Sequence, residues 1–401
     1  MSETRTSING VLAGVRVLDF GRYIAGPYCA ALLADLGADV IRVERRGGGE
    51  DRWVAPVGGD GVGAMFLAMN RNKRAMTLDP ACPEGREIVK KLVATADVVV
   101  ANLPPEVLRA LALDLESLRT IKPDIILTTV TAFGAGGPWS HRHGFDGIGQ
   151  AMCGSAYLTG TPEQPMRASI AWVDCGTAAL TAFGTLAALM ARGRTGRGQK
   201  VEGALLRTAV AFNNATLVEQ QVARPDRVAT LNRGQTAAPA DLFRTRDGWI
   251  VIHVIGRPMF ERWARLMGEE HWLADPRFQD DPSRGDHGEV ISQRMAEWTG
   301  GRTTAEALAE LERAKIPAGP LYSPQQALED AHIRAAGLLV DRDYPGLPRP
   351  VPLAPTPVDL SETPGGFRSP PPKIGEHTDA ILAELGYGRD EIARLREKNV
   401  I

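Results

Sequence analysis

Short, continuously apolar runs alternate with helical segments through the first 130 residues of the 401-residue chain. Gly14–Phe20 predicts a buried strand, Tyr28–Leu36 a helix, and Asp39–Glu44 a second strand. Strand, helix and strand within about thirty residues form a βαβ unit, in which the strands are parallel and the crossover is right-handed. Because the runs are continuously apolar, we expect helices to cover both faces of the sheet.

The same alternation returns at Gly85–Ala96 (helix), Asp97–Ala101 (strand), Leu108–Ile121 (helix) and Asp124–Val130 (strand). The predicted fold class is therefore α/β, with a doubly wound, Rossmann-like first half. The remaining predicted elements are a helix over Gly176–Arg192, a strand over Lys200–Ala204, a hairpin over Asp241–Val254 that turns at Asp247-Gly248, helices over Arg257–Met267, Ile291–Trp298 and Thr304–Arg313, and a terminal helix pair over Thr378–Leu385 and Arg389–Lys398.

The length of the chain predicts two domains, because 401 residues exceed one ordinary core. We expect a large Rossmann-like domain over 1–205, completed by about 335–401. A smaller α+β domain is expected over 225–330. Its linkers are expected at about 205–225 and 330–372, and the second linker is rich in proline and extended.

Composition excludes several classes of protein. The net charge is −2 and no Lys/Arg run exceeds two residues, so no nucleic-acid partner is expected. The four cysteines are widely spaced without a CxxC pair, and His141-x-His143 has no suitably spaced partner, so we expect neither a disulfide scaffold nor a metal site. The polar N-terminus and the short apolar stretches predict a cytoplasmic protein without a membrane partner.

The chain carries a conspicuous carboxylate at Asp174. It follows the apolar stretch Ile170–Val173 and precedes Gly176, which predicts the end of a strand at the turn into a helix over Ala178–Met190. Strand ends of an α/β sheet are where ligands usually bind. On these residues alone an aspartate before a helix is more often an N-cap, so both interpretations stay open.

Neither glycine-rich segment has the spacing of a phosphate loop. Gly47–Gly49 and Gly193–Gly198 are expected to be turns. Since no GxGxxG follows the first strand, a nicotinamide-dependent dehydrogenase is disfavoured.

A set of short motifs runs in order from about residue 12 to the C-terminus. The set consists of Leu12–Phe20, Ala25-Gly26-Pro27, Leu33–Glu44, Asn70–Arg74, Ala96–Asn102, Gly134-x-x-Gly137-Pro138, Thr195–Gln199, Ile316–Pro320 and Gly375–Thr378. Together these motifs resemble the family III CoA-transferases, the family of formyl-CoA transferase and carnitine CoA-transferase.

The resemblance implies that Asp174 is a nucleophile. Such an enzyme transfers coenzyme A from an acyl-CoA to a free carboxylic acid through aspartyl anhydride and aspartyl-CoA intermediates. A carboxylate suits this chemistry because an anhydride keeps the activation of the thioester, whereas a hydroxyl would give a stable ester. Acyl-CoA would be a substrate, and no permanently bound cofactor is implied.

The resemblance also implies residues around the nucleophile. Phe145 would form an apolar wall near the thioester, and Asp146 would lie close to Asp174 and raise the pKa of one of the two carboxyls. The family often has an arginine eight residues after Asn102, where this chain has Ala110. The implied coenzyme A contacts are Ile24, Ala25, Arg45, Leu78, Asn102, Leu103, Arg109 and Phe145.

Two alternatives share the implied fold. An α-methylacyl-CoA racemase needs a base on each face of the reacting carbon, and its branch carries a histidine where this chain has Phe145. A non-catalytic acyl-CoA-binding protein is disfavoured because Asp174 is kept. The absence of a glycine run between Gly234 and Gly256 also disfavours oxalate and formate as substrates.

The resemblance finally implies an interlocked homodimer. The connections near 205–240 and 340–375 are long, and an extended segment buries little surface of its own. We expect it to gain contacts from a partner chain or from the other domain.

Overall fold

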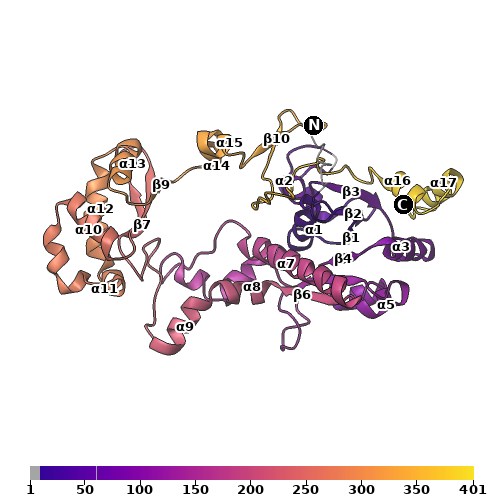
Figure 1. The fold of residues 1–401 in the computed structure, drawn as a ribbon, viewed down its shortest axis with the longest axis horizontal. Coiled ribbons are helices and arrows are strands. Elements are labelled where there is room, and N and C mark those ends of the chain that lie inside the picture. The colour runs from indigo at the N-terminus through magenta and orange to yellow at the C-terminus, as the bar shows by residue number, and fades with distance from the viewer. Residues whose placement is uncertain (1–9, 60) are drawn as a thin grey trace, which may run out of the picture. The chain divides into compact units, whose positions relative to one another are not determined.

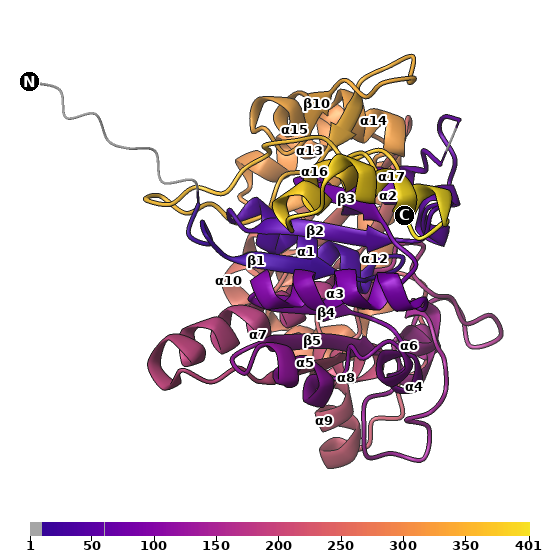
Figure 2. The same cartoon turned by 90° about the vertical axis from the view of Figure 1, so that its right-hand side faces the viewer.

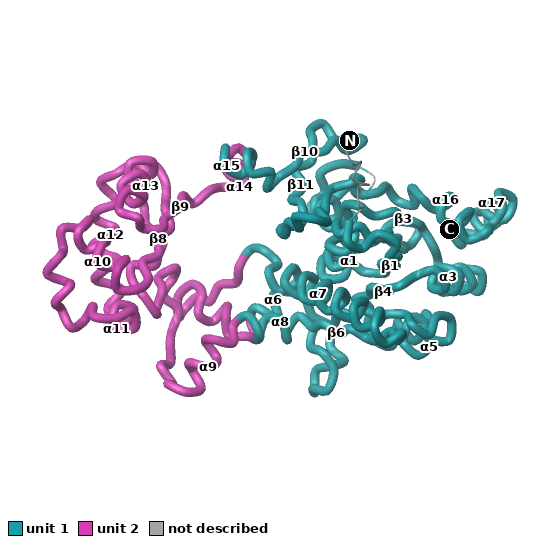
Figure 3. The backbone as a smooth tube through the Cα atoms, in the orientation of Figure 1, with its two compact units in different colours: residues 1–150, 169–212, 331–401 teal, residues 151–168, 213–330 magenta. Residues whose placement is uncertain are grey.

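The computed structural model describes residues 10–59 and 61–401. The chain forms two compact units, which Figure 3 colours separately. The first contains the residues up to 150 together with 169–212 and 331–401, and the second contains 151–168 and 213–330. The segment 151–168, which we had expected in the large domain, therefore groups with the second unit.

A six-stranded parallel sheet forms the centre of the first unit. Its order is β3-β2-β1-β4-β5-β6, and Figure 2 shows the strands from β3 to β5 in this sequence. This is the order of a Rossmann fold, and it confirms the predicted α/β class. The strands are β1 (Arg16–Asp19), β2 (Asp39–Glu44), β3 (Lys73–Thr77), β4 (Val98–Ala101), β5 (Ile126–Thr131) and β6 (Lys200–Ala204).

The order reverses between β1 and β4, which lie side by side with Leu18 opposite Val99. At such a switch point the loops after the two neighbouring strands diverge and leave a crevice. The topology therefore places a crevice at the carboxyl ends of β1 and β4.

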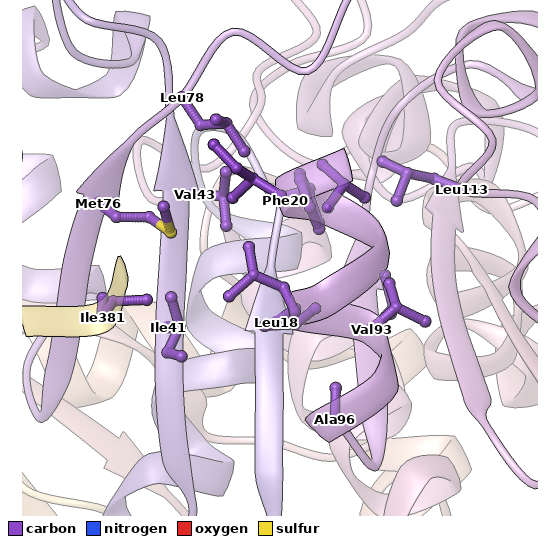
Figure 4. Packing of buried hydrophobic residues seen from close by; sticks show 14 of the residues in the cluster. Leu18, Phe20, Ile41, Val43, Met76, Leu78, Val93, Ala96, Leu113 and Ile381 are labelled. Carbon is purple, nitrogen blue, oxygen red and sulfur yellow. The ribbon is translucent and has the colours of Figure 1, made fainter. Parts of the chain in front are cut away.

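Helices cover both faces of this sheet (Figure 1). On one face, α1 (Ala25–Asp35) and α7 (Trp172–Thr195) share a core with β1, β2, β4 and β5. On the other face, α3 (Pro83–Thr95), α5 (Leu115–Ile121) and the C-terminal helices pack over a core that includes the residues of Figure 4. The C-terminal helices are α16 (Thr378–Glu384) and α17 (Arg389–Glu397).

Helix α7 is long and apolar enough to cross a membrane by length and composition alone. Its Val173, Ala178, Ala182 and Ala188 are nevertheless buried in the unit. One face of α7 therefore belongs to the core of the first unit.

Three local predictions were wrong. The predicted helix over Leu108–Ile121 is two helices, α4 (Pro105–Ala110) and α5, because Ala112 adopts φ +54° and Asp114 caps a new start. Strand β3 was not predicted, since its sequence KRAMT has a buried lysine where an apolar residue is expected. The residues directly before Asp174 do not form the predicted strand, and Asp174 lies in the first turn of α7.

The second unit contains the antiparallel sheet β7-β8-β9, which confirms the predicted hairpin. Trp263 and Phe260 are buried where the surrounding helices pack. Its elements are η2 (Ala156–Leu158), α9 (Asn214–Ala223), β7 (Ala240–Arg244), β8 (Trp249–His253), α10 (Arg257–Met267), η3 (Glu270–Ala274), η4 (Pro276–Phe278), α11 (Asp281–Asp286), α12 (Gly288–Gly300), α13 (Thr304–Arg313), β9 (Ala318–Pro320) and α14 (Pro324–Glu329).

The remaining elements are η1 (Glu50–Trp53), α2 (Ala64–Met69), α6 (Asp146–Met152), α8 (Leu205–Phe212), α15 (Ala331–Ala335) and the antiparallel pair β10 (Val340–Arg342) and β11 (Val351–Leu353). Between 354 and 377 the chain has no helix or strand. Helix α15 and the pair β10–β11 lie within the linker that the sequence predicts at about 330–372.

Candidate active site

A cleft of about 300 Å³ lies in the first unit at the carboxyl ends of β1, β4 and β5. Its position is the switch point of the sheet, where ligands of open α/β sheets bind. The sequence-predicted residues that line it are Ile24, Ala25, Asn102, Leu103, Phe145 and Asp174.

Asp174 enters this cleft from the first turn of α7. The residue before the helix, Ala171, provides no side-chain cap. Asp146 caps the helix instead, because its Oδ1 accepts hydrogen bonds from the backbone N–H of Val173 at 2.8 Å and of Asp174 at 3.2 Å. Asp146 thus satisfies two N–H groups at the helix start and leaves the Asp174 carboxyl on the cleft wall.

Gln150 fixes Asp146 one helical turn away on α6. Its Nε2 donates to Asp146 Oδ2 at 2.5 Å and to the Ile170 carbonyl at 3.3 Å. Asp146 is only 7% exposed, so both carboxyl oxygens have partners in a buried position. Gln150 therefore ties α6 to the chain that leads into α7.

Burial, and secondly the charge of Asp146, raise the pKa of Asp174 from its ordinary value of 3.8 to about 7. Near neutral pH the carboxyl is therefore close to half ionised. Burial and the two carboxylates also raise the pKa of Cys175, so that the neighbouring side chain remains a thiol. The thiolate is the reactive form of cysteine, so Cys175 is a poor nucleophile here.

The turn between β1 and α1 forms another wall of the cleft. Asn102, just after β4, accepts a hydrogen bond from Arg22 N at 2.7 Å and donates one to Arg22 O at 2.8 Å. Tyr23 has φ +59° and lies edge-on to Phe145, with ring centroids 5.9 Å apart. Phe145 itself is 65% exposed.

The other predicted contact residues lie in two further hollows that share Leu103 with the cleft. Arg45 and Leu78 line the first, of about 110 Å³, and Arg109 lines the second, of about 260 Å³. Arg45 donates to the carbonyl of Gly48 at 2.7 Å. Asp146 is the predicted residue that lies behind the cleft rather than on its wall.

The sequence did not predict several of the residues that line the cleft: Arg22, Tyr23, His141, Arg142, His143 and Leu205. The two histidines had been interpreted as plain loop residues. Their position just before Phe145-Asp146 was the available signal. Within residues 10–59 and 61–401 no cluster of His, Cys, Asp or Glu can hold a metal ion.

A buried ionic network supports the β1–α1 turn from below. Lys73 Nζ donates to Asp19 Oδ2 and to Pro27 O, both at 2.7 Å, and to Asn70 Oδ1 at 2.8 Å. Burial lowers the pKa of Lys73 to about 8 despite the attraction of Asp19. The lysine therefore joins the end of β1 to the first turn of α1.

Comparison with known proteins gives one consistent result. The family model described as CoA-transferase family III matches residues 12–378. The succinyl-CoA–D-citramalate CoA-transferase of Chloroflexus aurantiacus is 34% identical, with 97% of this chain and 98% of the relative aligned. The formyl-CoA:oxalate CoA-transferase of Rhodopseudomonas palustris is 31% identical, with 97% of each aligned.

Solved structures agree with the sequence relatives. A CAIB/BAIF family protein from Brucella suis superposes with a TM-score of 0.82 at 33% identity, over 94% of this chain and 100% of that one. Rv3272 from Mycobacterium tuberculosis superposes with a TM-score of 0.79 at 28% identity, over 93% and 99%.

Proposed function

The chain belongs to CoA-transferase family III, and we propose that it transfers coenzyme A between an acyl-CoA and a free carboxylic acid through covalent intermediates on Asp174. The observation that carries the proposal is the position of this carboxyl. It opens into a cleft at the switch point of the sheet, with a pKa of about 7. A carboxyl with a raised pKa that faces a cleft is the expected form of a catalytic group.

Each step conserves the energy of the thioester. The Asp174 carboxylate attacks the thioester carbonyl, the coenzyme A thiolate leaves, and a mixed anhydride forms. The thiolate then attacks the aspartyl carbonyl, which releases the donor acid and leaves an aspartyl-CoA thioester. The acceptor carboxylate attacks this thioester, which releases the thiolate again and forms a second mixed anhydride. The thiolate then attacks the acyl carbonyl of that anhydride, which regenerates Asp174 and gives the new acyl-CoA.

We assign Asp146 a supporting role in these steps. It holds the first turn of α7 through Val173 N and Asp174 N, and its charge contributes to the raised pKa of Asp174. A more basic carboxylate is a stronger nucleophile once it is ionised, and the fixed helix start limits its motion.

Coenzyme A would lie along the hollows that share Leu103. Ile24, Ala25 and Phe145 line the cleft beside Asp174. Arg45 with Leu78, and separately Arg109, line the two neighbouring hollows and would meet the nucleotide end. These two arginines supply positive charge for phosphate groups.

The racemase alternative lacks a base at the expected place. Phe145 cannot exchange a proton, and Asp146 is engaged by Gln150 and by the start of α7. A racemase would incorporate solvent deuterium at the α-carbon of a 2-methylacyl-CoA without transfer of coenzyme A. A non-catalytic acyl-CoA-binding protein would bind coenzyme A and form no adduct.

Mass spectrometry of the intact protein tests the proposal. Relatives named for succinyl-CoA transfer to citramalate, malate, glutarate and mesaconate make succinyl-CoA the first donor to use, with four- and five-carbon dicarboxylic acids as acceptors. We expect a coenzyme A adduct on the peptide that contains Asp174, and new acyl-CoA after the acid is added. Asp174→Ala should lose both and still bind free coenzyme A, and retention of transfer by that variant would refute the mechanism.

We further propose that the enzyme is an interlocked homodimer of the cytoplasm. Leu180, Phe183 and Met190 on α7 are 45%, 70% and 70% exposed, an apolar face that a partner chain would cover. All four cysteines are free, as expected for a reducing compartment. Sedimentation of an active 43 kDa species at nanomolar concentration would rule out the dimer.

A further inference from the structure

The turn between β1 and α1 holds a residue in an unfavourable backbone conformation. Tyr23 has φ +59°, a backbone conformation that residues other than glycine, asparagine and aspartate seldom adopt. Its ring nevertheless lies on the cleft wall, edge-on to Phe145 at 5.9 Å. Strained residues persist where the surroundings fix them, and they concentrate at functional sites.

Side chains from β1, from β3 and from the loop after β4 fix this turn. Asp19 Oδ1 accepts from Gly21 N at 2.8 Å, Lys73 donates to Pro27 O at 2.7 Å, and Asn102 bonds both N and O of Arg22. Asn102 differs from the other two because it comes from the far side of the switch point. Its carboxamide pairs with both the backbone N–H and the backbone C=O of Arg22.

The carboxamide of Asn102 is committed to this pairing. Its oxygen and nitrogen lie 2.7 and 2.8 Å from Arg22 N and O, and a Cβ added at Gly26 would meet the Asn102 Oδ1 at 3.1 Å. The side chain is therefore packed between the β1–α1 turn and the first turn of α1. The sequence implied a direct coenzyme A contact for Asn102, and these two bonds give its carboxamide a second possible role in holding the turn.

We propose that Asn102 is a positioning residue: its two hydrogen bonds to the backbone of Arg22, here called the clamp, hold the strained Tyr23 against Phe145 beside Asp174. The proposal rests on the transferase function inferred above. The Tyr23–Phe145 pair fixes the wall along which the thioester approaches the nucleophile. Loss of the clamp lets the turn relax, so that the reacting atoms spend less time in the productive geometry.

Two variants test the clamp, measured with succinyl-CoA and the acid found active with it. Asn102→Ala removes both hydrogen bonds to Arg22. Asn102→Asp keeps the oxygen that accepts from Arg22 N but places a carboxylate oxygen against the Arg22 carbonyl oxygen, which repels it. We expect kcat to fall roughly 10- to 100-fold in both, as for other small displacements at reacting centres. The calorimetric Kd for free coenzyme A should change by less than about threefold, since in this proposal the carboxamide acts through the turn and not through contact with the ligand.

Asn213→Ala is the matched control. Asn213 Nδ2 also donates to a backbone oxygen, that of Cys153, at 2.7 Å, but it lies in the second unit. Its kinetics should equal those of the unmodified protein. If Asn102→Ala keeps a normal kcat but its Kd for coenzyme A rises tenfold or more, the proposal is overturned in favour of direct contact. If kcat and Kd are both unchanged, the proposal is overturned in favour of a structural role.

A second readout does not depend on turnover. Hydrogen exchange at the Arg22 amide should accelerate at least tenfold in Asn102→Ala, because its acceptor is lost. In a double-mutant cycle the Asn102→Ala effect on kcat should shrink at least threefold when Phe145→Ala is already present, whereas additive effects would contradict action through the aromatic pair. Failure of the unmodified protein to transfer coenzyme A would refute the function itself, while normal kcat in Asn102→Ala beside an active parent refutes only the clamp.

Discussion

Replacement of Asp174 by asparagine should stabilise the folded protein, and the gain should grow with pH. The pKa of Asp174 is raised in the folded state, from 3.8 to about 7, so folding favours the protonated carboxyl. Below pH 3.8 the side chain is protonated in both states and costs nothing. As pH rises from 3.8 to 7 the unfolded chain ionises first, so the free energy of unfolding falls, and above 7 the full cost is present.

The magnitude follows from the size of the pKa difference. At about 1.4 kcal/mol per pH unit, the raised pKa of Asp174 lowers the free energy of unfolding by about 4 kcal/mol at pH 8 and by about 2 kcal/mol at pH 5. Asparagine has nearly the shape of the protonated acid and does not ionise. Asp174→Asn should therefore exceed the parent in stability by these amounts, while it loses transferase activity.

Urea unfolding followed by tryptophan fluorescence measures the difference between the two proteins at pH 5, 6, 7 and 8. Protein concentration and ionic strength are held fixed, because association and screening also affect stability. Asp146→Asn is the companion variant, in which the smaller cause of the raised pKa is removed and the pKa of Asp174 should fall but stay above 3.8. A gain that is constant with pH, or that shrinks as pH rises, would refute the reasoning.

Substitutions at three further positions of the first unit test how it is held together. Asp146→Ala should lower the free energy of unfolding by about 1–2 kcal/mol, because the start of α7 loses its cap, whereas Asp146→Asn should lose less; thermal unfolding compares the two. Lys73→Met should cost about 3–5 kcal/mol in urea unfolding because it leaves Asp19 buried without its cation, and a neutral effect would show that the pair is dispensable. Gly198→Ala should destabilise by more than about 2 kcal/mol, since its Cβ would lie 2.0 Å from the carbonyl oxygen of Ile125, and an unchanged melting temperature would contradict this.

The parts of the fold that were predictable are those with a local signal. Strands Asp39–Glu44 and Lys200–Ala204 and helices Arg257–Met267 and Thr304–Arg313 have the bounds that the sequence indicated. Strand β3 lacked such a signal, because Lys73 is buried through partners on β1, on α1 and just after α2 that the local pattern does not reveal.

The residues of the candidate site were predictable in type and less so in their geometry. Asp174, Asp146 and Phe145 followed from the resemblance to the family, and the structure brings all three together. The bonds between Asn102 and Arg22 join residues 80 positions apart, and the left-handed Tyr23 has no sequence signature. Such long-range contacts depend on the order of the strands in the sheet. The sequence predicts the α/β class of the fold but not this order.

The cap of α7 also links the order of folding to the chemistry. The hydrogen bond from Val173 N reaches an acceptor 27 residues earlier, and Ala171 offers no substitute. A growing or partly folded chain can therefore form the middle of α7, but its first turn frays until α6 docks. The proposed nucleophile is positioned only when this tertiary contact forms. On the proposed mechanism, an incompletely folded chain therefore has no ordered carboxylate that could attack and consume thioesters.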